Sequence, residues 1–88
     1  MKIIEREIPQ PMEIYRHFKG NRYVIMSGEA MNCTNDDIHS NENFVVYCDL
    51  LGRYYYICKQ SEFLSPVDKE KYPDAGQEWC FKKVGKVF

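Results

Sequence analysis

The 88-residue chain is 44% hydrophobic and 28% charged, with a formal net charge of −1 at pH 7. A chain of this length has room for one hydrophobic core, so we expect a single domain over residues 1–88. The near-neutral charge argues against a protein that binds nucleic acid through an overall basic surface, so any such binding has to be local.

The opening MKIIEREIPQ contains no uninterrupted apolar segment of the kind that export signals carry, and no apolar run approaches the roughly 20 residues that span a bilayer. We therefore expect a cytoplasmic protein without a membrane partner. In that compartment cysteines stay reduced, and two of the four lie inside strand-like apolar runs. The cysteines are Cys33, Cys48, Cys58 and Cys80. They form no Cys-x-x-Cys or Cys-x-x-His pair, so we expect no metal and no cofactor.

The first half of the chain contains one predicted hairpin. Residues 1–12 form an arm or an edge strand, because the prolines at its end cannot donate to a sheet ladder. Aromatic and branched residues then favour strands over 13–18 and 22–26, with Gly20-Asn21 as the turn between them. Residues 32–43 are rich in Asn, Asp and Ser, which indicates a long polar loop.

The second half predicts another hairpin and a final strand. Residues 44–51 and 54–59 are strand-like runs on either side of Gly52, and we expect these two strands to be central. Residues 61–64 favour one helical turn, residues 71–76 have turn chemistry, and residues 77–84 form the last strand.

Five or six short strands with at most one short helical turn indicate an all-β, mainly antiparallel fold. We expect a small SH3-like barrel over residues 13–84, because closure of the sheet protects edges that a chain of this size cannot otherwise cover. An α+β roll is the competing architecture.

Several strings in the chain resemble a small uncharacterised family found in bacteria and their phages. They are YRHFKGN at 15–21 with Tyr23, VVY at 45–47 with Leu50 and Gly52, Phe63, Asp68, KYP at 71–73, Gln77 and Phe81. The resemblance covers residues 14–84, and its hallmark is the six-residue string YRHFKG. It implies a compact β-rich domain and no particular activity.

The chain also departs from this family pattern. The family has a His-Ser-Glu-Thr-like string soon after the second strand, which here corresponds either to residues 32–35 or to residues 39–42. It has an Arg-Pro pair at the end of the fourth strand, where this chain has Cys58-Lys59. The resemblance therefore implies a divergent member with an altered ligand if these strings form the site.

Residues 15–23, YRHFKGNRY, are the best candidate for a site. They combine aromatic rings and basic groups without an acid, which is what an anionic or planar ligand requires. The simpler interpretation of Tyr15, Phe18 and Tyr23 is that they pack in the core. Arg16 and His17 should point to opposite faces of a strand, and a strand histidine is more often a packed residue than a catalytic base.

Three consecutive tyrosines at 54–56 place phenol rings on both faces of the next strand. They fit either a subunit interface or a platform for a base or sugar, and both interpretations predict exposed tyrosines. With Lys59 nearby to meet a phosphate, they complete the predicted ligand site. Its candidate residues are Tyr15, Arg16, His17, Lys19, Arg22, Tyr54, Tyr56 and Lys59.

The sequence favours binding over catalysis. Cys33 or Cys58 with His17 or His39 gives residue types for acyl transfer without a local signature, and Asp36-Asp37 suits a solvated turn. We expect a non-enzymatic protein that binds a small anionic, nucleotide-like molecule and forms a homo-oligomer. Sequestration of the ligand, in the manner of a phage protein, is the role that we expect from such binding. The alternative is a protein-interaction or nucleic-acid adaptor that uses the same surface.

Overall fold

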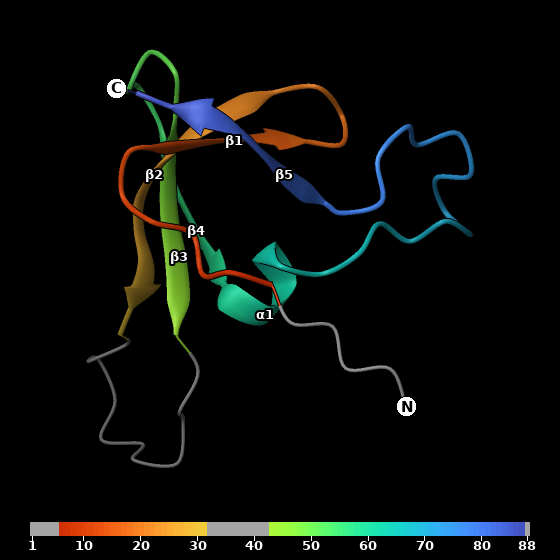
Figure 1. Cartoon of the computed structure of the whole chain (residues 1–88), viewed down its shortest axis with the longest axis horizontal. Coiled ribbons are helices and arrows are strands. Elements are labelled where there is room, and N and C mark those ends of the chain that lie inside the picture. Colours follow the sequence, from red (N-terminus) through yellow and green to blue (C-terminus); the bar gives the residue numbers. More distant parts are fainter. Residues whose placement is uncertain (1–5, 32–42, 88) are drawn as a thin grey trace.

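The computed structural model describes residues 6–31 and 43–87 and contains one antiparallel sheet (Figure 1). The elements are β1 (Glu13–His17), β2 (Arg22–Ala30), β3 (Phe44–Asp49), β4 (Tyr55–Lys59), α1 (Gln60–Phe63) and β5 (Phe81–Lys86). This confirms the predicted all-β, SH3-like architecture with one short helical turn. Within the described residues, no helix is long and apolar enough to cross a membrane.

Both predicted hairpins form. In the β1–β2 hairpin, the His17 N–H donates to the Asn21 carbonyl at 2.8 Å, and Gly20 adopts a φ of 109° that favours glycine. In the β3–β4 hairpin, the Asp49 carboxylate accepts hydrogen bonds from the backbone N–H groups of Arg53 and Tyr54. Local turn chemistry therefore fixes the register of each strand pair.

The sheet has the strand order β4-β3-β2-β1-β5 and is not closed into a barrel. β2 is the middle strand, whereas β4 is an edge, so the prediction that both strands of the second hairpin are central is wrong for β4. The reason is that β5 pairs with β1 on the far side of the sheet and does not reach β4. The sheet therefore stays open between its two edge strands, β4 and β5.

The last strand begins later than predicted, at Phe81 instead of residue 77. Residues 78–80 pair with the segment that follows α1: the Val67 N–H donates to the Glu78 carbonyl, and the Cys80 N–H donates to the Ser65 carbonyl. These bonds leave residues 78–80 outside the main sheet. The segment between α1 and β5 extends away from the sheet (Figure 1).

The core lies on one face of the sheet, called the inner face here, which carries Tyr15, Ile25 and Val45. α1 follows directly from β4 and places Phe63 over this face, fully buried. The Phe63 ring stacks on Phe81 of β5, with centroids 4.1 Å apart and planes 13° from parallel. Alternation along the strands therefore gives a buried inner face and a more exposed outer face.

The arm that precedes β1 is not a strand over its described residues, 6–12. The Arg6 guanidinium donates to the carbonyls of Leu64 and Phe81, and it lies 4.4 Å from the Trp79 ring centroid. Pro9 is fully buried. Residues 1–5 and 32–42, which include most of the predicted polar loop, lie outside the described part of the chain.

The close approach of the arm to β2 depends on Gly28. A Cβ at this position would overlap the carbonyl oxygen of Pro9, which belongs to the backbone and cannot rotate away. We expect Gly28→Ala to lower the free energy of unfolding by about 1–3 kcal/mol, the usual cost of overpacking. Urea denaturation followed by tryptophan fluorescence measures this change.

Gly85→Ala is the matched control, because Gly85 is also a strand glycine and a Cβ there meets no atom within 4 Å. We expect it to change the free energy of unfolding by less than about 0.5 kcal/mol. Equal effects at the two glycines would contradict the packing account.

Candidate functional site

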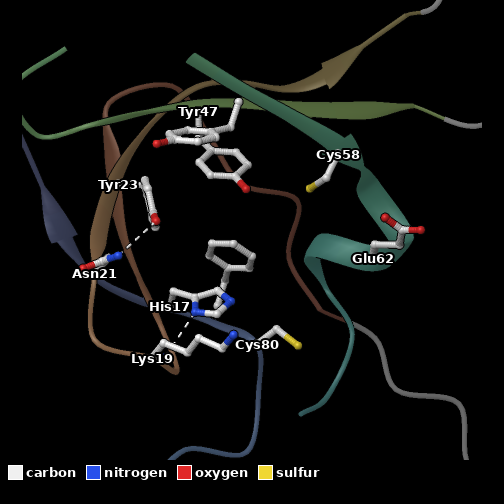
Figure 2. Close-up of a pocket in the computed structure, with 10 residues that line it drawn as sticks. His17, Lys19, Asn21, Tyr23, Tyr47, Cys58, Glu62 and Cys80 are labelled. Carbon is white, nitrogen blue, oxygen red and sulfur yellow. Dashed lines mark hydrogen bonds between the residues drawn. The ribbon is translucent and has the colours of Figure 1, made fainter. Parts of the chain in front are cut away.

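A pocket of about 370 Å³ lies on the inner face, beside α1 and between the two edge strands. Every strand and the helical turn contribute to it. Its lining consists of His17, Lys19, Asn21, Tyr23, Tyr47, Tyr56, Cys58, Glu62, Cys80 and Phe81. Figure 2 shows Tyr23 and Tyr47 on one side of the space, His17, Lys19 and Cys80 opposite them, and Cys58 and Glu62 beside the helical turn.

Four rings form the aromatic wall of this pocket: Tyr23, Tyr47, Tyr56 and Phe81. Tyr47 stacks on Tyr56 at 5.3 Å, and Tyr23 meets both rings edge-on at 5.1 and 5.5 Å. Burial raises the pKa of Tyr47 to about 12, so its hydroxyl stays protonated at neutral pH. The wall thus offers flat apolar surface together with the protonated hydroxyl of Tyr47.

His17 presents a defined ring nitrogen to the pocket. Its Nδ1 accepts a hydrogen bond from the Lys19 backbone N–H at 3.1 Å, so the neutral ring carries its proton on Nε2. Burial, and secondarily the charge of Lys19, lowers the pKa of His17 below its ordinary value of 6.5. At neutral pH the imidazole is therefore uncharged and can donate one hydrogen bond from Nε2.

Lys19 supplies the cation of the pocket. Its Nζ lies 5.2 Å from the centroid of the Tyr72 ring and 5.9 Å from that of Phe18, within the range of cation–π attraction. The Phe18 and Tyr72 rings also pack against each other at 4.8 Å. The two rings therefore hold the lysine at the pocket while leaving its three donors available.

The remaining polar groups are two thiols, a carboxylate and the amide of Asn21. Burial raises the pKa of the Cys58 thiol to about 11, so it is protonated and a poor nucleophile at neutral pH. Glu62 is exposed on α1 and is the carboxylate among the described lining residues. No group of three or more His, Cys, Asp or Glu residues in the described part of the chain could hold a metal ion.

A second open pocket, also about 370 Å³, adjoins the first at the ends of the hairpins. The two share Asn21, Tyr23 and Tyr56. The second pocket adds Arg22, Asp49 and the turn residues Leu50 and Leu51. Tyr23 and Tyr56 thus lie between two pockets. Lys19 lines the first pocket, and Arg22 lines the second.

The structure separates the eight predicted site residues. His17, Lys19 and Tyr56 meet at the pocket, and Arg22 lines the second pocket. Tyr15 lies in the core with 4% exposure, where it can contact no ligand without unfolding. The other three are exposed and do not line either pocket: Arg16 on the outer face, Tyr54 before β4, and Lys59 at the start of α1.

Several lining residues were not among the predicted site residues. Tyr47, Cys58 and Phe81 come from strands far from the first hairpin in sequence. The signal for Tyr47 is strand alternation, because it is the register partner of both Ile25 and Tyr56 on the inner face. Phe81 pairs with His17 in the same way. Both assignments need the strand order, which no local pattern gives.

A family model described as "Protein of unknown function (DUF1653)" matches residues 13–82. The chain belongs to this family. No match was found among the curated proteins. No solved structure matches the chain either.

Several positions that the DUF1653 resemblance rests on are structural. Gln77 donates to the carbonyls of Arg16, Trp79 and Cys80, which ties the segment before β5 to the first hairpin. Asp68 accepts hydrogen bonds from two backbone N–H groups of the turn that follows it. By contrast, the departure from the Arg-Pro pair falls on Cys58, which lines the pocket.

The lowered pKa of His17 predicts a pH dependence of stability. Below about pH 6.5 the unfolded chain binds a proton that the folded protein does not yet accept. The free energy of unfolding should therefore fall as the pH decreases through 6.5 and level off below the folded pKa. Urea denaturation between about pH 8 and about pH 5 measures this effect.

His17→Gln is the control variant, since its amide oxygen can still accept from the Lys19 N–H and does not titrate. We expect the variant to lose part of the pH dependence in this window. A pH profile identical to that of the unmodified protein would show that His17 does not contribute.

Proposed function

We propose that the protein binds, without converting it, a small anionic molecule that carries a flat ring, such as a nucleotide. The observation that supports this most is the pairing, across one pocket, of the aromatic wall with the donors of Lys19 and His17. A volume of about 370 Å³ lies within the range usual for small-molecule sites. The expected role is to hold or sequester the ligand.

The aromatic wall suits the ring of such a ligand. Tyr56 keeps 40% of its surface exposed although it packs against Tyr23 and Tyr47, so it can cover a planar ligand without repacking the core. Stacking of a base on an aromatic side chain contributes about 1–3 kcal/mol and tolerates any base. Base identity then depends on polar groups at the rim, where Glu62 can accept hydrogen bonds from ring N–H groups.

The opposite side suits the anionic group. Lys19 provides a full charge, and the neutral His17 ring adds a directed N–H donor beside it. Because Glu62 comes from α1, on another side of the pocket, it need not face the anion (Figure 2). The ligand would thus be oriented with its ring against the tyrosines and its phosphate or carboxylate toward Lys19.

The same groups are poorly arranged for acyl transfer. A nucleophile-activating histidine needs an acceptor for its Nδ1–H, whereas the Nδ1 of His17 itself accepts from the backbone. The Cys58 thiol has a pKa of about 11 and remains protonated. These two facts support a binding role over a thiol-based reaction.

The proposal predicts stabilisation by nucleoside monophosphates. At 100 times its dissociation constant a ligand adds about 2.7 kcal/mol, which corresponds to a rise in Tm of roughly 10–20 °C for a domain of this size. Differential scanning fluorimetry with nucleoside monophosphates, the matching nucleosides and inorganic phosphate separates the contributions of ring and anion. We expect the monophosphates to give the largest shift.

Lys19→Gln should reduce the shift with monophosphates to that with nucleosides, because it removes the charge and keeps a polar side chain of similar size. Lys71→Gln is the control, since Lys71 is exposed and outside both pocket linings. If no nucleotide raises the Tm of the unmodified protein, the proposal fails.

A second candidate function, self-association, is favoured by the exposed edge strand β4. Tyr55 and Ile57 are 64% and 66% exposed. The hydrogen bonds from Asp49 N–H to the Tyr54 carbonyl and from Gln60 N–H to the Asn43 carbonyl fix the alternation of the ladder. Tyr55 and Ile57 therefore turn their backbone groups away from β3, toward the open edge. We propose that β4 pairs with β4 of a second copy to form a homo-oligomer.

Ile57→Lys should convert the oligomer to a monomer, because a lysine on an edge strand opposes further pairing. Size-exclusion chromatography with light scattering measures the mass. Val84→Lys is the matched control on β5, where Val84 is also exposed and Arg6 already occupies the edge carbonyl of Phe81. A monomeric unmodified protein at high concentration would reject this candidate.

A further inference from the structure

Three basic side chains stand in direct register across three neighbouring strands. Arg16 of β1 pairs with Arg22 of β2 on one side and with Lys82 of β5 on the other. All three are exposed. Neighbouring strands lie about 4.8 Å apart, so this basic row of Lys82, Arg16 and Arg22 spans about 10 Å across the sheet.

The basic row lies on the outer face, away from the core. Each member is next in sequence to an inner-face residue: Arg16 follows Tyr15, Lys82 follows Phe81, and Arg22 precedes Tyr23. Successive side chains of a strand point to opposite faces. The row is therefore a different surface from the pocket that holds His17 and Lys19.

Within the described residues, no acidic side chain forms an ion pair with the basic row. The contrast on the same strand is Lys83, whose Nζ lies 2.6 Å from the Glu13 carboxylate. Burial opposes ionisation of Glu13, but the hydrogen bonds from Lys83 and Gln10 outweigh it and keep the pKa of Glu13 below its ordinary value. Glu13 thus neutralises the other end of β5, and the row keeps its charge.

Like charges directly opposite one another destabilise a sheet. The row places two such pairs side by side, so its assembly works against folding. An anionic chain laid across the row would remove this repulsion and release its own counterions. The geometry therefore favours a polyanion as the natural occupant of this surface.

The surroundings of the row indicate which polyanion fits. Its Arg22 end lines the second pocket together with Tyr23, Tyr56 and Asp49. The Asp49 carboxylate already accepts hydrogen bonds from the backbone N–H groups of Arg53 and Tyr54. A chain that crosses the row thus arrives at aromatic rings. Single-stranded nucleic acid has both a phosphate backbone and unstacked bases to place on such rings, whereas a duplex keeps its bases stacked and an acidic peptide has no flat group for each charge.

We propose that the basic row binds the phosphodiester backbone of single-stranded nucleic acid, with a base entering the second pocket beside Arg22. This site is local, which agrees with the formal net charge of −1. Its phosphate contacts at Arg16 and Lys82 do not depend on the ligand of the first pocket, because these two residues line neither pocket, whereas Tyr23 and Tyr56 line both.

Fluorescence anisotropy with a labelled oligothymidylate, titrated at several salt concentrations, tests the proposal. Three neutralised phosphates give a slope of about −2 for log K against log salt, since each contributes about −0.7 for a single strand. The affinity should then fall about 20-fold between about 50 and about 200 mM salt. The same sequence as a duplex should bind more weakly.

Arg16→Gln should reduce the slope to about −1.4 and weaken binding, because it removes the central cation of the row. Lys86→Gln is the matched control on β5, because Lys86 faces Glu13 in the register and lies outside the row. Its slope should equal that of the unmodified protein. If Arg16→Gln fails to fold, as judged by circular dichroism, Lys82→Gln at the end of the row replaces it.

Three results would overturn the proposal: no binding of the oligothymidylate at low salt, equal losses in Arg16→Gln and Lys86→Gln, or displacement of the oligothymidylate by polyglutamate of equal charge. The last result would assign the row to an acidic protein partner. None of them bears on the nucleotide shift predicted for Lys19, so the two proposals fail separately.

Discussion

The contact between Phe63 and Phe81 compensates for the incomplete closure of the sheet. No backbone ladder joins β4 to β5, so the two edges are held together from the inner side by the ring of Phe63, carried on the helical turn that follows β4. Arg6 adds two hydrogen bonds that link the end of α1 to the β5 edge. The pocket lies beside this contact, between the two edge strands on the inner face. This position explains why every strand contributes to its lining.

Local features of the sequence predicted most of the strands. Gly20-Asn21 and Gly52 mark both hairpin turns, and the runs of branched and aromatic residues mark the strands beside them. The order of the strands depends on pairing between β1 and β5, which lie more than 60 residues apart, and no local pattern encodes it. For this reason the edge position of β4 was not predicted. The late start of β5 has a different origin, the pairing of residues 78–80 with the segment after α1.

Only part of the candidate site was predicted. Composition identifies a segment of the chain but does not say which face of the sheet each residue occupies. Residues 15–23 do contain His17 and Lys19, and the alternation of Arg16 and His17 was correctly inferred. The same alternation sends Tyr15 into the core, which was the simpler of the two interpretations of this ring and removes it from the predicted ligand site. The rings that line the pocket come from other strands and enter it through register, which depends on the whole sheet.

The alternation of side chains along β1 explains the different roles of the residues in the string YRHFKG. Tyr15 fills the core, Arg16 centres the basic row, His17 lines the pocket, and Gly20 closes the turn at a positive φ. A strand of five residues thus supplies both faces of the sheet with different chemistry, at the cost of three cations in register on the outer face. Packing alone would be satisfied by neutral residues at Arg16, Arg22 and Lys82, because their side chains are exposed. Packing therefore does not require charge at these three positions, and the proposed binding surface would give the charges a role.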